Sequence, residues 1–96
     1  MNSDFSAARA RLDAAEAKRE EVLLRHIANG VMIESRTVEI DESVVIAPGA
    51  KILSGTILRG KTVIGAGCVI GPNTLIEDST VDGGTTVNAS QVYGSH

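Results

Sequence analysis

Few side chains in this 96-residue sequence are of the types that perform chemistry. The only histidines are His26 and His96, and the single cysteine is Cys68. A histidine base or a cysteine nucleophile needs a partner group and a suitable pocket. His26 precedes a helix stop, where a cation interacts favourably with the helix dipole. Cys68 has no Lys, Arg or His near it in the sequence. We interpret both as structural and predict no catalytic residue.

Other clusters that resemble binding sites are also explained by structure. The glycine-rich run at 65–71 lacks the helix that a dinucleotide fingerprint requires after it. The acidic pairs at 41–42 and 77–78 are expected to share one solvated edge. The second half has one group of neighbouring basic residues, Lys51, Arg59 and Lys61. We interpret these as solvated side chains rather than as an anion site. No cofactor-binding or metal-binding residue is predicted from these patterns.

The composition excludes several classes of protein. Aromatic residues make up 2% of the chain, and the net charge is −3. Stacking platforms for single-stranded nucleic acid need aromatic rings, and nucleic-acid binding in general needs a basic surface. No apolar run is long enough to span a membrane or to form a signal peptide. One cysteine cannot form an internal disulfide, which predicts a cytoplasmic protein.

The first part of the chain predicts one long helix. Ala, Leu, Glu, Lys and Arg dominate it, and the first of the ten glycines is Gly30. The helix is expected from about Asp4 to Ala28, with Ser3 or Asp4 as N-cap. Residues 1–30 therefore form a helical linker arm. Its bulky C-terminal residues are expected to cover the start of the second part of the chain, through Leu23, Leu24 and Ile27.

Residues 31–96 contain an internal repeat. Large aliphatic residues recur every six positions, slip once by one residue, and resume: Ile40, Ile46, Ile52, Leu58, Ile64, Ile70, Ile76, Val81 and Val87. A second set, mostly small or β-branched, occurs four positions after each of these: Val44, Ala50, Thr56, Thr62, Cys68, Thr74, Thr80, Thr85 and Gln91. Period six fits a short strand followed by a corner, and three such units close one coil. The sequence predicts a mainly β protein, a hexapeptide-repeat parallel β-helix of about three coils, with the aliphatic set as its core and the glycines as corners.

The hexapeptides at 64–69 and 70–75 resemble those of left-handed β-helix acyltransferases, and the left hand is implied by this resemblance. A second feature points to one family among these acyltransferases: a charged helix ends at 27–31 and leads directly into the repeats. In this order of elements the chain resembles the family of bifunctional N-acetylglucosamine-1-phosphate uridyltransferases / glucosamine-1-phosphate N-acetyltransferases. That family makes UDP-N-acetylglucosamine in the bacterial cytoplasm for peptidoglycan and the cell wall.

The resemblance implies what a full-length relative would contain. The nucleotide-binding loop and the later coils with the catalytic histidine are absent from this sequence. Mg²⁺, acetyl-CoA, glucosamine-1-phosphate and UTP are therefore expected only in the full-length enzyme. By this resemblance Asn2 corresponds to the family's Mg²⁺-binding asparagine and is the only candidate for a metal ligand. Without the rest of that domain it would have nothing to bind, so no metal-binding residue is predicted in this chain. The β-helix is expected to be truncated at its C-terminal end, and the chain alone is expected to be inactive. Its expected role is that of a scaffold that forms a homotrimer. No binding to nucleic acid or to a membrane is expected.

Two alternatives remain open. The chain can be part of another hexapeptide acyltransferase, or a non-enzymatic oligomerisation module. A γ-type carbonic anhydrase would need three histidines on the coils to bind zinc, and none lies there. Outward-facing aliphatic residues are expected to form flat faces suited to oligomerisation: Val45, Leu53, Ile57, Val63, Val69 and Leu75.

Overall fold

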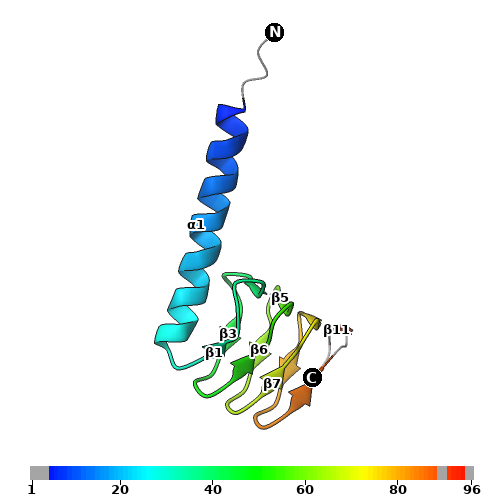
Figure 1. Ribbon diagram of the computed structural model, residues 1–96. Coiled ribbons are helices and arrows are strands. Elements are labelled where there is room, and N and C mark those ends of the chain that lie inside the picture. Colours follow the sequence, from blue (N-terminus) through cyan, green and yellow to red (C-terminus); the bar gives the residue numbers. More distant parts are fainter. Residues whose placement is uncertain (1–4, 89–90, 95–96) are drawn as a thin grey trace.

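The fold is known from a computed structural model, which describes residues 5–88 and 91–94. One long helix leads into a stack of short strands (Figure 1). The helix α1 (Ser6–Ala28) begins two residues later than predicted, with Phe5 at the N-cap position and no side-chain cap. The predicted caps Ser3 and Asp4 lie outside the described residues. The helix ends where predicted, because Asn29 closes its last turn and Gly30 adopts a φ of +93°.

The strands form a parallel β-helix, as predicted. Their bounds are β1 (Met32–Ile33), β2 (Glu39–Ile40), β3 (Val45–Ile46), β4 (Lys51–Ile52), β5 (Ile57–Arg59), β6 (Val63–Ile64), β7 (Val69–Ile70), β8 (Leu75–Glu77), β9 (Thr80–Val81), β10 (Thr86–Val87) and β11 (Gln91–Tyr93). They assemble into sheet A (β1-β4-β7-β10), sheet B (β2-β5-β8-β11) and sheet C (β3-β6-β9). Because consecutive strands visit the three sheets in turn, each coil of the chain contributes one strand to each sheet.

The core is the predicted aliphatic column. Ile52, Leu58, Ile64, Ile70 and Ile76 are fully buried at 0% exposure. Ile40, Ile46 and Val81 are also buried, and Val87 is partly buried. In strands β2 to β9 the residue before each of these points outward. Each short strand therefore has one core side chain next to one outward side chain or, in the three-residue strands β5 and β8, between two. The period of six therefore predicted the inward residue of each strand correctly.

The slip after Ile76 changes the second set of residues. Leu75 is in register with Ile57, 18 positions earlier, whereas Thr80 is in register with Val63, 17 positions earlier. The coil that ends at Thr80 is therefore one residue shorter than the coils before it. As a result Ser79 is the buried small residue, and Thr80 occupies the outward position. Thr80, which the fixed offset of four positions assigns to the second set, is therefore not the buried small residue of this coil.

The end of the described chain departs from the pattern in the same way. Gln91 is exposed and pairs with the outward Leu75, while Val92 pairs with the core residue Ile76 and packs against the core. Thr85 is exposed as well. Gln91, which the same offset assigns to the second set, lies at an outward position because the coil between β8 and β11 is shorter by one further residue.

The helix covers the first coil with one of the three predicted residues, Leu23, and with Val22, which was not predicted. Val22 and Leu23 are buried, at 3% and 6% exposure, whereas Leu24 and Ile27 are half exposed. Helix α1 contacts β1 and β2, and its N-terminal part projects away from the coils (Figure 1). Over the residues described, no helix combines the length and apolar character needed to cross a bilayer.

Candidate functional site at the helix junction

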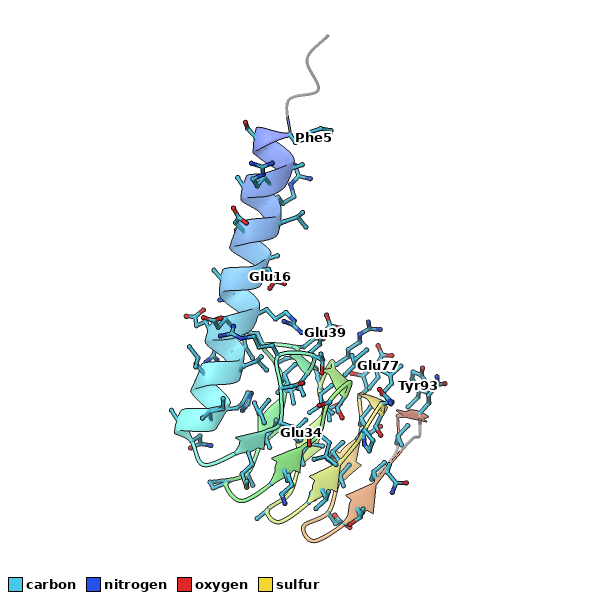
Figure 2. All side chains as sticks on the ribbon, in the orientation of Figure 1. Phe5, Glu16, Glu34, Glu39, Glu77 and Tyr93 are labelled. Carbon is cyan, nitrogen blue, oxygen red and sulfur yellow. The ribbon has the colours of Figure 1, made fainter. Side chains whose placement is uncertain are left out.

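Charged side chains gather where the helix meets the first coil. We call them the junction cluster: Lys18, Arg19, Glu20 and Arg25 from α1, and Arg36, Glu39 and Glu42 from the first coil. Figure 2 shows Glu39 beside the helix at this junction and Phe5 at the far end of the arm. Only two apolar residues of α1 are buried, and the charged pairs of this cluster add further contacts between the arm and the first coil.

Glu42 is the shared anion of the junction cluster. Its carboxylate lies 2.6 Å from Lys18 Nζ and 3.8 Å from Arg25 Nη2. The hydrogen bond and charge of Lys18 lower the pKa of Glu42, and Arg25 lowers it further. In return, Glu42 raises the pKa of Lys18. The corner after β2 is thus joined to two turns of the helix.

Arg19 is the least exposed cation of the cluster. Its side chain is 26% exposed, and its Nη2 donates to the carbonyl oxygens of Arg36 and, at 3.2 Å, of Val38. Its Nε lies 4.0 Å from the Glu39 carboxylate. Arg36 reaches back in the opposite direction and pairs with Glu20 of the helix. The helix therefore donates to the coil through Arg19, and the coil donates to the helix through Arg36.

The contacts of Glu42 predict how the junction responds to acid. A folded-state pKa below the ordinary value means that the carboxylate favours the docked form above pH of about 4. This contribution is lost as the pH falls through the lowered pKa. We expect ¹⁵N relaxation of α1 amides to report a looser helix at pH values below this range, and Glu42→Gln to show the same loosening at neutral pH.

The matched control for Glu42→Gln is Asp13→Asn. Asp13 is an exposed residue on the projecting part of α1. If the two variants gave identical relaxation profiles at neutral pH, the assignment of Glu42 as the anchoring anion would be wrong.

A second group of acidic side chains organises the corner at Gly60. Asp41 Oδ2 accepts a hydrogen bond from the Gly60 N–H at 3.0 Å, and Asp78 Oδ1 accepts one from the Lys61 N–H at 2.9 Å. Asp78 adopts a φ of +50°, which Asp tolerates better than most residues. The two acidic pairs therefore share one edge, as predicted, and both aspartates bind the backbone of the coil between them.

The next corner is built from another polar network. Glu34 Oε1 accepts hydrogen bonds from the N–H and the hydroxyl of Ser54, both at 2.8 Å. These bonds lower the pKa of Glu34, and the charge of Lys51 adds to the effect. Thr37 Oγ1 accepts from the Gly55 N–H at 3.0 Å. This corner is thus held by side chains of the preceding coil.

The candidate chemical residues are not brought together. Cys68 is buried at 0% exposure, with Sγ 3.0 Å from the Asp82 carbonyl oxygen. His26 is partly buried in the last turn of α1, where burial and then Arg25 lower its pKa. Among residues 5–88 and 91–94, no group of three or more His, Cys, Asp or Glu is placed to hold a metal. Asn2 and His96 lie outside the described residues.

The three basic residues of the second half are also separate. Lys51 lies on β4 in sheet A, Arg59 at the end of β5 in sheet B, and Lys61 at the following corner. The junction cluster was not predicted from the sequence. The sequence feature that could have indicated it is Arg19, a charged residue that interrupts the apolar face of the helix between Ala15 and Val22.

Open grooves flank the helix junction. One, of about 200 Å³, lies between α1 and the first coil and is lined by Leu23, Leu24, Ile27, Ile33 and Arg36, among others. Another, of about 580 Å³, includes Arg25, His26, Glu42 and Val45. Both combine aliphatic walls with charged rims, so each suits a protein surface better than a buried reaction centre.

The outward aliphatic residues are distributed over the three sheets. Val45 and Val63 are neighbours in sheet C and are the most exposed, at 58% and 40%. Ile57 and Leu75 are neighbours in sheet B, and both are partly buried. Val69 lies in sheet A, beside Lys51. The most exposed aliphatic pair is therefore on sheet C.

Comparison with known proteins supports the repeat assignment. Residues 43–78 match the family model of the bacterial transferase hexapeptide (six repeats). The match spans β3 to β8, the regular part of the β-helix. A search of curated proteins found no significant match. The repeat match and the three-coil β-helix together fit a hexapeptide-repeat transferase, with an acyltransferase-type module.

Proposed function

We propose that this chain is the linker arm and the opening coils of a hexapeptide-repeat acyltransferase of the kind that makes UDP-N-acetylglucosamine. Its role is scaffolding and trimerisation. The observation that carries the proposal is the docked helix: α1 is fixed to the first coil by Val22, Leu23 and the junction cluster, while its N-terminal part stands clear. A helix held in this way is suited to connect the β-helix to a preceding domain.

The finer assignment rests on the resemblance. The hexapeptide match covers residues 43–78 of the coils, and the order of charged helix and then repeats is that of the bifunctional uridyltransferase/acetyltransferase family. Acetyl transfer and uridyl transfer are assigned to the full-length enzyme. We assign Mg²⁺ and acetyl-CoA to other parts of that enzyme. Among the described residues, no three or more His, Cys, Asp or Glu side chains are grouped so that they could hold a metal ion.

The trimer is proposed to form through sheet C. Val45 and Val63 present adjacent aliphatic side chains there, and copies related by a threefold axis would bury them against one another. Val63→Asp would place a charge in that contact. Thr86→Asp, at an exposed position on sheet A, introduces the same charge away from it.

Sedimentation equilibrium at micromolar concentration tests this role. We expect a mass of about 30 kDa, three times the 10.0 kDa chain, which falls to the monomer mass for Val63→Asp and is unchanged for Thr86→Asp. A monomeric wild-type chain would contradict trimerisation. In the same preparation, acetyl-CoA and glucosamine-1-phosphate are expected to give no product, and turnover would show that this segment is itself the catalyst.

A further inference from the structure

The first strand of sheet B lacks a preceding strand among the described residues, and an arginine occupies the position that such a strand would fill. In this sheet, strand N–H groups donate to the next coil along the chain. The N–H of Glu39 donates to the Thr56 carbonyl at 2.9 Å, and the N–H of Ile57 donates to the Thr74 carbonyl at 2.7 Å. Thr56 and Thr74 each precede the register residue of their strand, Ile57 and Leu75.

Val38 holds the equivalent place in the first coil. It precedes Glu39, which is in register with Ile57, so its carbonyl corresponds to those of Thr56 and Thr74. The residue is buried at 0% exposure, and an unpaired carbonyl in such a place is costly. The donor that reaches the Val38 carbonyl is Arg19 Nη2, at 3.2 Å.

We propose that Arg19 is the positioning residue that sets the docking register and direction of the arm, by replacing the backbone donor of a preceding coil. The apolar contact of Val22 and Leu23 is non-directional and does not fix an angle by itself. A guanidinium that donates to two carbonyls fixes both the position and the orientation of its helix. It is also less exposed than Lys18, so salt screens its contacts less.

This arrangement defines how far the arm reaches. With Arg19 fixed on sheet B, the turns of α1 from Ser6 to Ala14 project beyond the junction, a length of about 13 Å at 1.5 Å per residue. Any domain joined to the arm would be held at a distance and angle set by one side chain. This role of Arg19 depends on the arm and the first coil alone, and not on which enzyme the chain belongs to.

Pulsed electron–electron double resonance tests the proposal directly. Spin labels at Ala8→Cys on the arm and Thr86→Cys on β10 report the distance between arm and coils, which changes with the angle of the arm. The buried Cys68 is left in place. With labelled chains diluted into an excess of unlabelled chains, so that each proposed trimer carries one pair of labels, we expect one narrow distance distribution for the wild type and at least a twofold broader one for Arg19→Met. Arg25→Met removes the same charge but only a 3.8 Å contact, so it should broaden little.

Two further measurements separate a positioning role from simple charge attraction. Arg19→Lys retains the charge and a single donor group, so an intermediate width is expected. Amide exchange near Val22 should accelerate at least tenfold in Arg19→Met, while Leu58 in the core stays protected. Equal broadening in Arg19→Met and Arg25→Met would overturn the proposal, because charge alone would then hold the arm. An unchanged distribution in Arg19→Met would overturn it as well.

Discussion

Replacing Ile64 by alanine is expected to destabilise the β-helix by about 2–5 kcal/mol, the range found when a buried Ile or Leu is truncated. Ile64 is fully buried in the middle of the core, between Ile46 of the preceding coil and Val81 of the following one. A coil has one large side chain from each sheet at its centre, so no neighbour on the same coil is free to fill the cavity. Unfolding in urea, followed by circular dichroism, measures the loss.

Val63→Ala is the matched control for this change. Val63 precedes Ile64 on β6 and points outward, with 40% of its surface exposed. Truncation of an exposed side chain usually changes stability by less than about 0.5 kcal/mol. A similar loss of stability for both variants would contradict the central role of the aliphatic column in the core, unless Val63→Ala also dissociated the proposed trimer. Sedimentation of the same samples separates these cases.

The core was predictable because the repeat carries its own register. A period of six places one residue of each strand inward, and the same period sets the length of the strand and the corner. Ile52, Leu58 and Ile70 were therefore located without knowledge of the three-dimensional structure, and all are fully buried. The match of residues 43–78 to a hexapeptide family reflects the same regularity.

The errors occur where the regularity ends. After Ile76 the coils shorten twice, by one residue each time, and a fixed offset of four positions no longer finds the buried small residue. Ser79, one position before the second-set residue Thr80, is the buried small residue, and Val92, one position after the second-set residue Gln91, packs inward. A shortened corner leaves the aliphatic spacing readable, but it moves the residues between the aliphatics by one place.

The junction cluster was beyond the reach of sequence reasoning for a different reason. Arg19 and Glu42 are far apart in the sequence, and nothing in the spacing of either predicts that the helix passes over the corner of the first coil. The helix was expected to dock through Leu23, Leu24 and Ile27. Leu23 is buried as expected, but the rotation of the helix buries Val22 beside it and leaves Leu24 and Ile27 half exposed. Charged contacts between elements depend on this rotation, which periodicity does not determine.

The glycines divide into two classes that the sequence does not distinguish. All were predicted as a helix stop or corners, and eight of the ten do adopt positive φ. Gly65 and Gly83 do not. A Cβ on Gly65 would lie 2.5 Å from the backbone nitrogen of Gly83 and 2.8 Å from its Cα. Gly65 is therefore needed for the close approach of two coils rather than for an unusual backbone angle.

Replacing Gly65 by alanine is accordingly expected to cost about 3 kcal/mol, at the upper end of the range for overpacking, because the clash is with backbone and not with a movable side chain. The neighbouring contacts should loosen too: the Gly65 N–H donates to Val81 at 2.8 Å, and the Gly84 N–H donates to Ala66 at 2.9 Å. Urea unfolding gives the total effect, and amide exchange at Gly65 and Gly84 locates it between these two coils.

Gly84→Ala distinguishes the clash from the cost of backbone strain. Gly84 has a φ of +77°, but a Cβ there would meet nothing within 4 Å, so alanine incurs only the penalty of the left-handed conformation, about 1–2 kcal/mol. Gly65→Ala should be the more damaging of the two, although Gly65 lacks the positive φ that marks a conventional corner glycine. If Gly84→Ala were instead the more damaging, backbone conformation rather than contact between coils would be the main requirement for glycine in this β-helix.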